Sequence, residues 1–310
     1  MRLFHFPSVV TSFTGTLLTA LSVHASPVAC FNSVSGQFCI ELFETQAPIT
    51  TSNFMSYINS GAYTQGIFHR SVPGFVVQAG GYKIAPGSNN QPSIFSVNTF
   101  PPITNEFGLS NKRGTVAMAK IADDADSATS QWFVNLSDNS SNLDRTNGGY
   151  TVFGQIVFDG MNVIDAIASL PVVTVNQIFN EIPLVNYDTS KPITLNNLVQ
   201  IFDVKVTDVT GIFHAGTLNF AVDIGENSPG YRVNLKLIQD SPDFIFELDP
   251  TNLEVLSVKP TNTAIFSTQD GLLTIPNVMI EPFIAVKNVV MRRSSPDTYQ
   301  FRLESYESVN

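Results

Sequence analysis

The sequence is poor in the residues that carry most covalent and metal chemistry. Its 310 residues include only two cysteines and four histidines, and two of the histidines lie within the first 25 positions. The other two, His69 and His214, are too few for a histidine-rich zinc site, and neither cysteine has a histidine at catalytic spacing. We therefore expect no metal site, no cofactor and no cysteine protease.

Charge is also scarce, and its balance is negative. Charged residues make up 14% of the chain, with 16 basic against 26 acidic side chains and a net charge of −10. A surface that follows a phosphate backbone needs an excess of basic residues, so nucleic acid is excluded as a partner. The hydrophobic content of 43% with 24 Phe is typical of a globular protein. The length suggests two folded units.

A long apolar run occurs only at the N-terminus. The first 25 residues contain no acid, carry Arg2, and continue through an apolar stretch over residues 9–23 to Val23-His24-Ala25. This pattern is typical of a secretory signal, here residues 1–25, cleaved after Ala25. We therefore predict an exported protein, periplasmic or secreted, with no integral membrane span.

Two alternatives to a cleaved signal remain open at this stage. The run could be a membrane anchor, although it is shorter than the roughly 20 apolar residues that a spanning helix needs. Cleavage after Ala29, before Cys30, would resemble a bacterial lipoprotein, but Pro27 stands where a large aliphatic residue is usual.

The two cysteines, Cys30 and Cys39, flank the turn-prone stretch Ser33-Val34-Ser35-Gly36 between two strand-like segments. In a hairpin closed by that turn the two residues lie opposite each other, within reach of a disulfide that an exported protein can keep oxidised. The pair is a disulfide candidate, and two separate free thiols are the alternative.

Residues up to about 205 combine strand patterns with two helices. One helix is predicted to open at Ala47-Pro48 and to end at Asn59-Ser60-Gly61, and a second covers residues 161–168. A Pro/Asn/Ser-rich stretch over residues 85–102 predicts a long surface loop. This order fits a closed antiparallel barrel capped by helices better than a βαβ sheet. Strands are expected at residues 67–70, 74–78, 114–119, 131–135 and 151–156.

No helix signal is present beyond residue 206, where alternating segments predict an all-β C-terminal domain over residues 206–310. Ser241-Pro242-Asp243 followed by Phe246-Glu-Leu248 is echoed, at a spacing near 55, by Ser295-Pro296-Asp297 followed by Phe301-Arg-Leu303. The echo suggests two tandem units that stack their apolar faces.

Within residues 26–205, a series of short motifs occurs in the order and at the spacing typical of one family. The motifs are Phe68-His69-Arg70, Phe75 to Gly81, Gly114 to Ala119, Ser130-Gln131-Trp132-Phe133, Leu143-Asp144 and Val152-Phe153-Gly154. With these motifs, the segment resembles the cyclophilin peptidyl-prolyl isomerases over about residues 30 to 204, and the bacterial exported branch of that family in particular.

The resemblance implies a mainly β protein: an eight-stranded antiparallel barrel capped by two helices, followed here by a smaller all-β domain. It also implies peptidyl-prolyl cis-trans isomerase activity on proline-containing polypeptides. It assigns roles residue by residue. Arg70 matches the catalytic arginine, and Gln78 matches the glutamine that orients it. The proline pocket has Phe75 and Phe133 as its walls, Met118 beneath them, and Leu143 closing it beside Val76. Ala119 and Gln131 line the groove, and Tyr150 replaces the histidine of animal enzymes.

Four positions depart from the family pattern, and one of them, Ala79 in place of a glycine, is a mild change. Val76 replaces a methionine beside the pocket phenylalanine, and Lys120 stands where many members have a hydrogen-bonding asparagine. Asn142 occupies the position at which cyclosporin-sensitive members have tryptophan. Because the indole donor and ring surface are lost, we expect weak cyclosporin binding.

The chemistry of the reaction explains why an arginine suits it. The peptide bond resists rotation by roughly 18–20 kcal/mol because the nitrogen lone pair is delocalised into the carbonyl. A guanidinium aimed at the prolyl nitrogen bonds that lone pair only when the amide is twisted, which stabilises the transition state selectively. The alternative reading is a noncatalytic module for proline-peptide binding or envelope adhesion.

Overall fold

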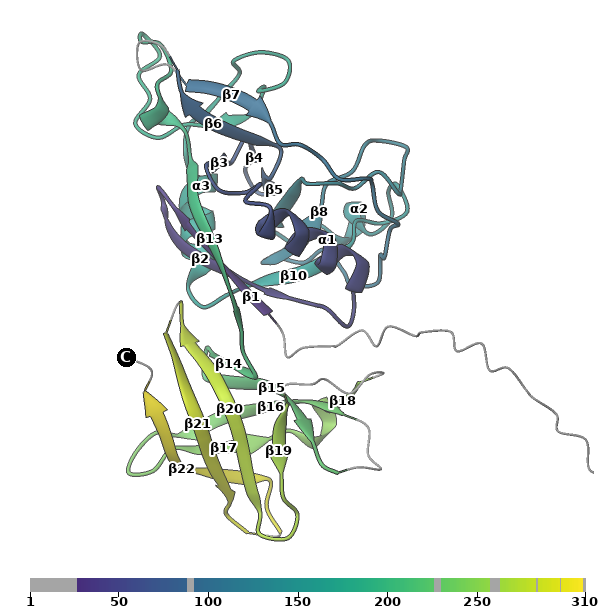
Figure 1. Ribbon diagram of the computed structural model, residues 1–310, viewed down its shortest axis with the longest axis vertical. Coiled ribbons are helices and arrows are strands. Elements are labelled where there is room, and N and C mark those ends of the chain that lie inside the picture. Colours follow the sequence, from purple (N-terminus) through teal and green to yellow (C-terminus); the bar gives the residue numbers. More distant parts are fainter. Residues whose placement is uncertain are drawn as a thin grey trace, which may run out of the picture.

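The computed structural model describes residues 27–87, 92–225, 230–256, 263–282, 284–295 and 297–308, and shows two β-rich lobes (Figure 1). The predicted signal peptide at residues 1–25 lies outside the described residues. None of the described helices is both long enough and apolar enough to cross a bilayer.

The first lobe is a single antiparallel sheet that curls on itself. Its order is β4-β5-β9-β8-β10-β2-β1-β13-β3-β6-β7. Because only two residues separate β3 from β4, one chain segment borders both β13 and β5, and eight strands close into the expected barrel. In chain order the strands are β1 (Pro27–Ser33), β2 (Gly36–Leu42), β3 (Gly66–Ile67), β4 (Arg70–Val72), β5 (Val76–Ala79), β6 (Tyr82–Pro86), β7 (Pro92–Ser96), β8 (Thr115–Met118), β9 (Trp132–Asn135), β10 (Val152–Val157) and β13 (Gln200–Asp208).

Two helices cover the barrel, as predicted. Helix α1 (Pro48–Asn59) buries Phe54 and Tyr57, and helix α3 (Gly160–Ala168) buries Ile164 and Ile167 against the same core. A cluster of aromatic rings in tilted and edge-on contact fills the interior around Trp132, which is fully buried. A third, short helix, α2 (Ser140–Leu143), lies on the loop after β9. The two-residue strands β11 (Val172–Val173) and β12 (Ile182–Pro183) form a separate ladder, and Leu195–Asn197 is a 3-10 turn.

The long loop predicted over residues 85–102 is wrong in part. Strand β7 lies within it and pairs with β6 from Tyr82↔Ser96 to Pro86↔Pro92. The pairing places Ile84 opposite Ile94, and both side chains pack in a small apolar cluster with Phe179 and Leu184. The composition predicts a loop because the prolines and asparagines mask this short alternation.

Strands β1 and β2 form the hairpin that the Ser33–Gly36 turn predicts, with Gly36 at a φ of +125°. The register places Cys30 opposite Cys39, and their Sγ atoms form a disulfide 2.03 Å long. Both side chains are buried in a cluster that also includes Ile212 and Met279 from the second lobe. The bridge therefore lies where the two lobes meet.

The second lobe is all-β, and its strands also close into a ring. The sheet order is β14-β15-β19-β20-β21-β22-β17-β16-β18, and the further pairing of β15 with β16 closes a barrel of seven strands, from β15 through β19, β20, β21, β22 and β17 to β16. The strands are β14 (Gly211–His214), β15 (Thr217–Asp223), β16 (Tyr231–Gln239), β17 (Ile245–Leu248), β18 (Glu254–Val255), β19 (Ala264–Phe266), β20 (Leu272–Glu281), β21 (Ile284–Arg293) and β22 (Gln300–Ser308), with a 3-10 turn at Pro250–Asn252.

The pairing pattern of this second barrel repeats when β14, β15, β16 and β17 are exchanged for β19, β20, β21 and β22. Each pairing among these eight strands has a counterpart: β14 runs parallel to β20 as β19 does to β15, and β17 pairs with β22. Phe246 lies opposite Phe301, the residues that the sequence echo aligns. The echoed segments are thus neighbours in one barrel with one core, not stacked separate units.

The second barrel has two open apolar pockets with equivalent walls. One has a volume of 370 Å³ and is lined by residues including Phe220, Leu235 and Phe301, and the other measures 340 Å³ and includes Leu218, Phe246 and Met291. The repeat therefore extends from the strand pairing to the packing.

The two lobes share a strand connection and a polar contact. Strand β13 runs from the first lobe toward the second (Figure 1), and the boundary predicted after residue 205 falls inside this strand. Arg232 of β16 reaches Glu41 of β2 at 3.7 Å, and Gln155 Nε2 donates to the same carboxylate at 2.8 Å. The Glu41 side chain is only 5% exposed, so this carboxylate is buried at the junction.

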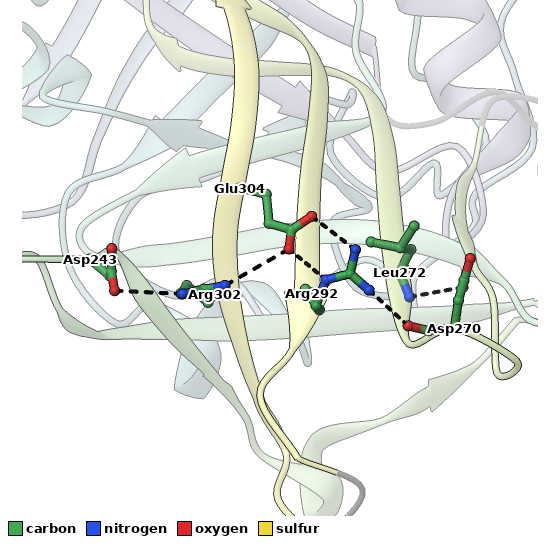
Figure 2. A network of polar contacts seen from close by, with 6 residues as sticks. All are labelled: Asp243, Asp270, Leu272, Arg292, Arg302 and Glu304. Carbon is green, nitrogen blue, oxygen red and sulfur yellow. Dashed lines mark hydrogen bonds and ion pairs between the residues drawn. The ribbon is translucent and has the colours of Figure 1, made fainter.

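A ladder of ion pairs crosses the outer surface of the second barrel (Figure 2). Arg292 and Arg302 are cross-strand neighbours on β21 and β22, and Glu304 accepts from Arg292 Nε at 2.5 Å while lying 4.0 Å from Arg302. Asp243 extends the ladder at 3.9 Å from Arg302. The Glu304 carboxylate lies between the two arginines, whose like charges would otherwise repel each other.

Candidate functional site

The predicted catalytic arginine begins strand β4 on the outer face of the first barrel. Register pairs Arg70 with Gln78, Gln78 with Phe133, Phe133 with Ala117, and Ala117 with Val152 across five neighbouring strands. Directly opposite residues of an antiparallel sheet project to the same face. Arg70 and Gln78 therefore share a face with the apolar residues of the row.

Those apolar residues belong to a cluster outside the barrel core, which we call the outer apolar cluster. It combines six of the residues predicted to bind substrate with neighbours that the sequence did not single out. Its buried members are Val76, Ala117, Phe133, Leu143 and Val152, with Phe43, Phe75, Leu109, Ala119 and Tyr150 packed against them.

Met118, predicted to pack beneath the pocket walls and to contribute to substrate binding, is buried on the other face of β8 and does not line the outer apolar cluster. Its side chain is buried in the barrel core together with Val116, whereas Ala117 between them belongs to the outer apolar cluster. Successive side chains of a strand point to opposite faces, so Met118 and Ala117 cannot both face the substrate. Ala117 is the β8 residue on the side of Arg70.

Gln78 and Gln131 meet beside the arginine. Gln78 Nε2 donates a hydrogen bond to Gln131 Oε1 at 2.8 Å. The Gln131 side chain lies over Gly81, where an added Cβ would come within 2.9 Å of it, and Gly80 has a φ of +84°. Gly81 therefore allows Gln131 to lie close to the backbone that follows β5, while Gly80 makes room for the Ser130 carbonyl and the Trp132 ring.

The guanidinium of Arg70 has a partner that the sequence did not indicate. Arg70 Nε donates to Glu181 Oε2 at 2.7 Å, and 34% of the Arg70 side chain is exposed. Glu181 is 111 positions away in the chain and directly precedes β12. No local pattern signals such a contact, because it depends on how the loop between β11 and β12 returns to β4.

His69, next to the arginine, is buried. Its ring meets Tyr82 edge-on at 4.9 Å, and burial lowers the pKa of His69 to about 4 even though a hydrogen bond from the imidazole to the Gln131 side chain opposes the shift. The imidazole is therefore neutral at physiological pH. It does not supply a second positive charge beside Arg70.

A chain of buried amides and one carboxylate ties together the segments that carry the outer apolar cluster. Asn139 Nδ2 donates to Asn135 Oδ1 and to the Phe75 carbonyl, and Asn135 Nδ2 donates to Asn111 Oδ1. Asn111 in turn donates to Asp144 Oδ1 through its backbone and its side chain. These bonds fix Phe75 and the α2 loop relative to β9.

Asp144 ends this network as an acceptor. Burial favours its neutral form, but the hydrogen bonds from Asn111 outweigh that effect and lower the pKa of Asp144. Asp144 directly follows Leu143, so its ionised carboxylate holds α2 at the rim of the outer apolar cluster.

Lys120 and Asn142 show what the departures from the family pattern do. Lys120 Nζ donates to the carbonyls of Asn147 and Gly149 at 2.7 Å and lies 4.8 Å from the centre of the Tyr150 ring. Burial lowers the pKa of Lys120, against the nearby acids Asp126 and Asp124. Asn142 is exposed on α2.

The residues around Arg70 can bind, orient and polarise a peptide, and they include no metal-binding arrangement. In the described parts of the chain, no group of three or more His, Cys, Asp or Glu side chains lies close enough to hold a metal ion. The chemistry that this arrangement supports is hydrogen bonding from the Arg70 guanidinium next to the outer apolar cluster.

Comparison with known proteins gives a consistent result for the first lobe. The profile of the family described as "Cyclophilin type peptidyl-prolyl cis-trans isomerase/CLD" matches residues 29–189. A peptidyl-prolyl cis-trans isomerase of Acinetobacter baylyi is 40% identical over 163 residues, which cover 52% of this chain and 81% of the relative. Peptidyl-prolyl cis-trans isomerase A of Dickeya dadantii is 35% identical over 192 residues, 61% of this chain and 90% of the relative.

Among solved structures, a cyclophilin-type isomerase of Cryptosporidium parvum, determined in the presence of the dipeptide Ala-Pro, aligns with 58% of this chain and 99% of its own. The TM-score is 0.42 and the sequence identity 21%.

Proposed function

The chain belongs to the cyclophilin-type peptidyl-prolyl cis-trans isomerase family and is an isomerase of that class, and we propose that Arg70 is its catalytic residue. The observation that carries the proposal is the row across five strands, which places Arg70 on the same face as Phe133, Ala117 and Val152. A cation beside an apolar surface is what rotation about a prolyl bond requires.

In the proposed reaction the outer apolar cluster holds the proline ring, and the acyl side rotates. Phe133 and Leu143 are 4% and 6% exposed, so water is largely excluded from this part of the outer apolar cluster. As the amide twists, the prolyl nitrogen regains its lone pair, and a guanidinium N–H donates to it. Carbonyl and nitrogen lose their resonance together, so no covalent intermediate is needed.

The groove beside the ring is proposed to bind the residues that precede proline. Gln78 and Gln131 already form a hydrogen bond with each other, and each retains a further donor or acceptor for a peptide backbone. Ala119 presents little bulk at the edge of the cluster. We infer that this edge admits an extended polypeptide with few constraints on sequence.

The test is a proline-isomerisation assay on the protein and on Arg70→Ala. Loss of a transition-state donor of this kind costs about 10²–10³ in rate, and circular dichroism should not change. Arg70→Lys keeps the charge but loses the fork, and we expect it to recover only part of the rate. Full activity of Arg70→Ala would refute the mechanism. Peptide binding without activity in the unaltered protein would favour a binding module instead.

We also propose that the protein acts on exported polypeptides, in the periplasm or outside the cell. The signal-like residues 1–25 and the disulfide between Cys30 and Cys39 support this location, because disulfides persist in oxidising compartments. Fractionation of the source cells and N-terminal sequencing test it. A chain that begins at Ser26 outside the cytoplasm is expected, and an uncleaved cytoplasmic chain contradicts the proposal.

A further inference from the structure

We propose that Glu181 is a positioning residue that fixes the Arg70 guanidinium for isomerisation, an inference that rests on the catalytic role proposed for Arg70. The Glu181 carboxylate accepts the Nε–H of Arg70 at 2.7 Å. Glu181 need not touch the substrate. It acts through the orientation of the group that does.

The contact selects which donors of the arginine remain for the substrate. A guanidinium carries five N–H donors in a planar fork. With Nε–H held by Glu181, the four donors on the two terminal nitrogens are left, and the plane of the group is defined relative to the sheet. An unpaired arginine on a surface samples many rotamers and loses that entropy on binding. The carboxylate reduces this loss before substrate arrives.

Glu181 is itself held in place by its backbone and by the residues that follow it. The Glu181 carbonyl accepts from Ser71 N at 2.7 Å, the residue next to the arginine. Ile182, directly after it, is 1% exposed and packs in the cluster that contains Phe179. The loop is therefore attached to β4 at adjacent positions, by its main chain and by its side chain.

The ion pair contributes little to folding, so an effect on activity can be separated from one on stability. The side chains of Arg70 and Glu181 are 34% and 36% exposed. Exposed ion pairs of this kind contribute little that can be measured to the stability of a protein. Loss of the carboxylate is therefore expected to change turnover much more than the melting temperature.

The experiment compares Glu181→Ala, Glu181→Gln and Arg70→Ala with the double variant Glu181→Ala/Arg70→Ala. We expect Glu181→Ala to lower kcat/KM about 10-fold, mainly through kcat, with unchanged circular dichroism and melting temperature. Glu181→Gln retains an oxygen that accepts the Nε–H and should recover most of the activity. The double variant should be no slower than Arg70→Ala alone, measured at raised enzyme concentration.

Asp165→Ala is the matched control. Asp165 accepts from Arg113 at 2.6 Å, and the two side chains are 44% and 48% exposed. The Asp165→Ala substitution therefore breaks an ion pair of similar exposure that does not involve the row of residues across β4, β5, β9, β8 and β10. We expect full activity.

The outcomes separate the two proposals. If Arg70→Ala retains activity, the proposed mechanism fails. If Arg70→Ala is slow but Glu181→Ala matches the unaltered protein, only the positioning role fails. A further loss in the double variant, or no recovery in Glu181→Gln, would also overturn that role, because Glu181 would then act by another route.

Discussion

Burial of His69 makes the stability of the protein sensitive to mild acid. The pKa of His69 falls from 6.5 to about 4 in the folded protein because the ring is removed from water. Between these two pH values the unfolded chain binds more protons than the folded one, so stability declines as the pH falls through that window. We expect a loss of up to about 3 kcal/mol in the free energy of unfolding between pH 7 and pH 4.

Denaturant titrations at several pH values measure this loss, and Trp132, the only tryptophan, reports unfolding by fluorescence. His69→Phe preserves a ring against Tyr82 but cannot titrate, so its stability should vary less over the same window. Asp144, whose pKa is lowered, contributes in a different window at more acidic pH. An unchanged slope in His69→Phe would show that other groups control the acid response.

Cyclosporin sensitivity is predicted to depend on one exposed residue. The protein has Asn142 on α2, where the resemblance places the tryptophan of sensitive enzymes. An indole at this position adds a donor and a large apolar surface next to Leu143. We expect cyclosporin to inhibit Asn142→Trp at a concentration at least about 10-fold lower than the unaltered protein requires, as measured in an isomerisation assay. Nanomolar inhibition of the unaltered protein contradicts this expectation.

At the scale of single residues, the sequence predicted those site members that sit within motifs. Phe75, Val76, Phe133 and Leu143 do lie in one cluster. Met118 was assigned to the wrong side because a motif gives spacing but not the direction of each side chain. Glu181 was missed because its partner is distant in the chain, and only the folded loop brings them together.

Helix α1 depends on a cap supplied from another part of the chain. Ala47 provides no side-chain cap, and Glu106 instead accepts from Ile49 N at 3.0 Å and from Thr50 N at 2.7 Å. A carboxylate at this helix end satisfies exposed donors and interacts favourably with the helix dipole. We expect Glu106→Ala to lower the free energy of unfolding by about 1–2 kcal/mol, measured by denaturant titration.

Glu307→Ala, on the exposed end of β22, is the control for removal of one negative charge and should be near neutral. If both substitutions have the same small effect, the hydrogen bonds to α1 contribute nothing measurable. If Glu106→Gln stays close to the unaltered protein, the acceptor geometry matters more than the charge.

At the scale of elements, strong sequence patterns predict the observed helices and strands correctly, and weak patterns do not. The apolar periodicity of α1 and α3 predicted both helices, and the turn at Ser33–Gly36 predicted the first hairpin. Strand β7 and helix α2 were missed. Each is short, and each is stabilised by a partner from elsewhere: β7 by β6, and α2 by the hydrogen bonds of Asn139 and Asp144.

The two barrels are predicted to depend on each other through the buried carboxylate of Glu41. Without Arg232, the Glu41 carboxylate keeps Gln155 as its remaining described partner. The Glu41 side chain is only 5% exposed, so water does not replace the lost arginine easily. Loss of one member of a buried pair costs about 3–5 kcal/mol. Arg232→Ala should therefore lower the melting temperature clearly, as measured by calorimetry.

Glu254, the other acidic partner of Arg232, is 49% exposed. Glu254→Ala should cost less than about 1 kcal/mol, so it separates the buried contact from the exposed one. Equal effects of the two substitutions would indicate that the junction gains nothing from Glu41. Because β13 continues past residue 205 to pair with β1, a shortened chain should keep β13 whole.

In the second barrel the first strand of each half pairs with a strand of the other half. Strand β14 of the half β14–β17 pairs with β20, and β19 of the half β19–β22 pairs with β15. Neither half can complete a closed sheet alone, but two copies of one half would present each other with the same edges. This is the arrangement expected when an ancestral homodimer becomes a single chain by gene duplication and fusion. The 55-position interval between Phe246 and Phe301 would then be the length of that ancestral subunit.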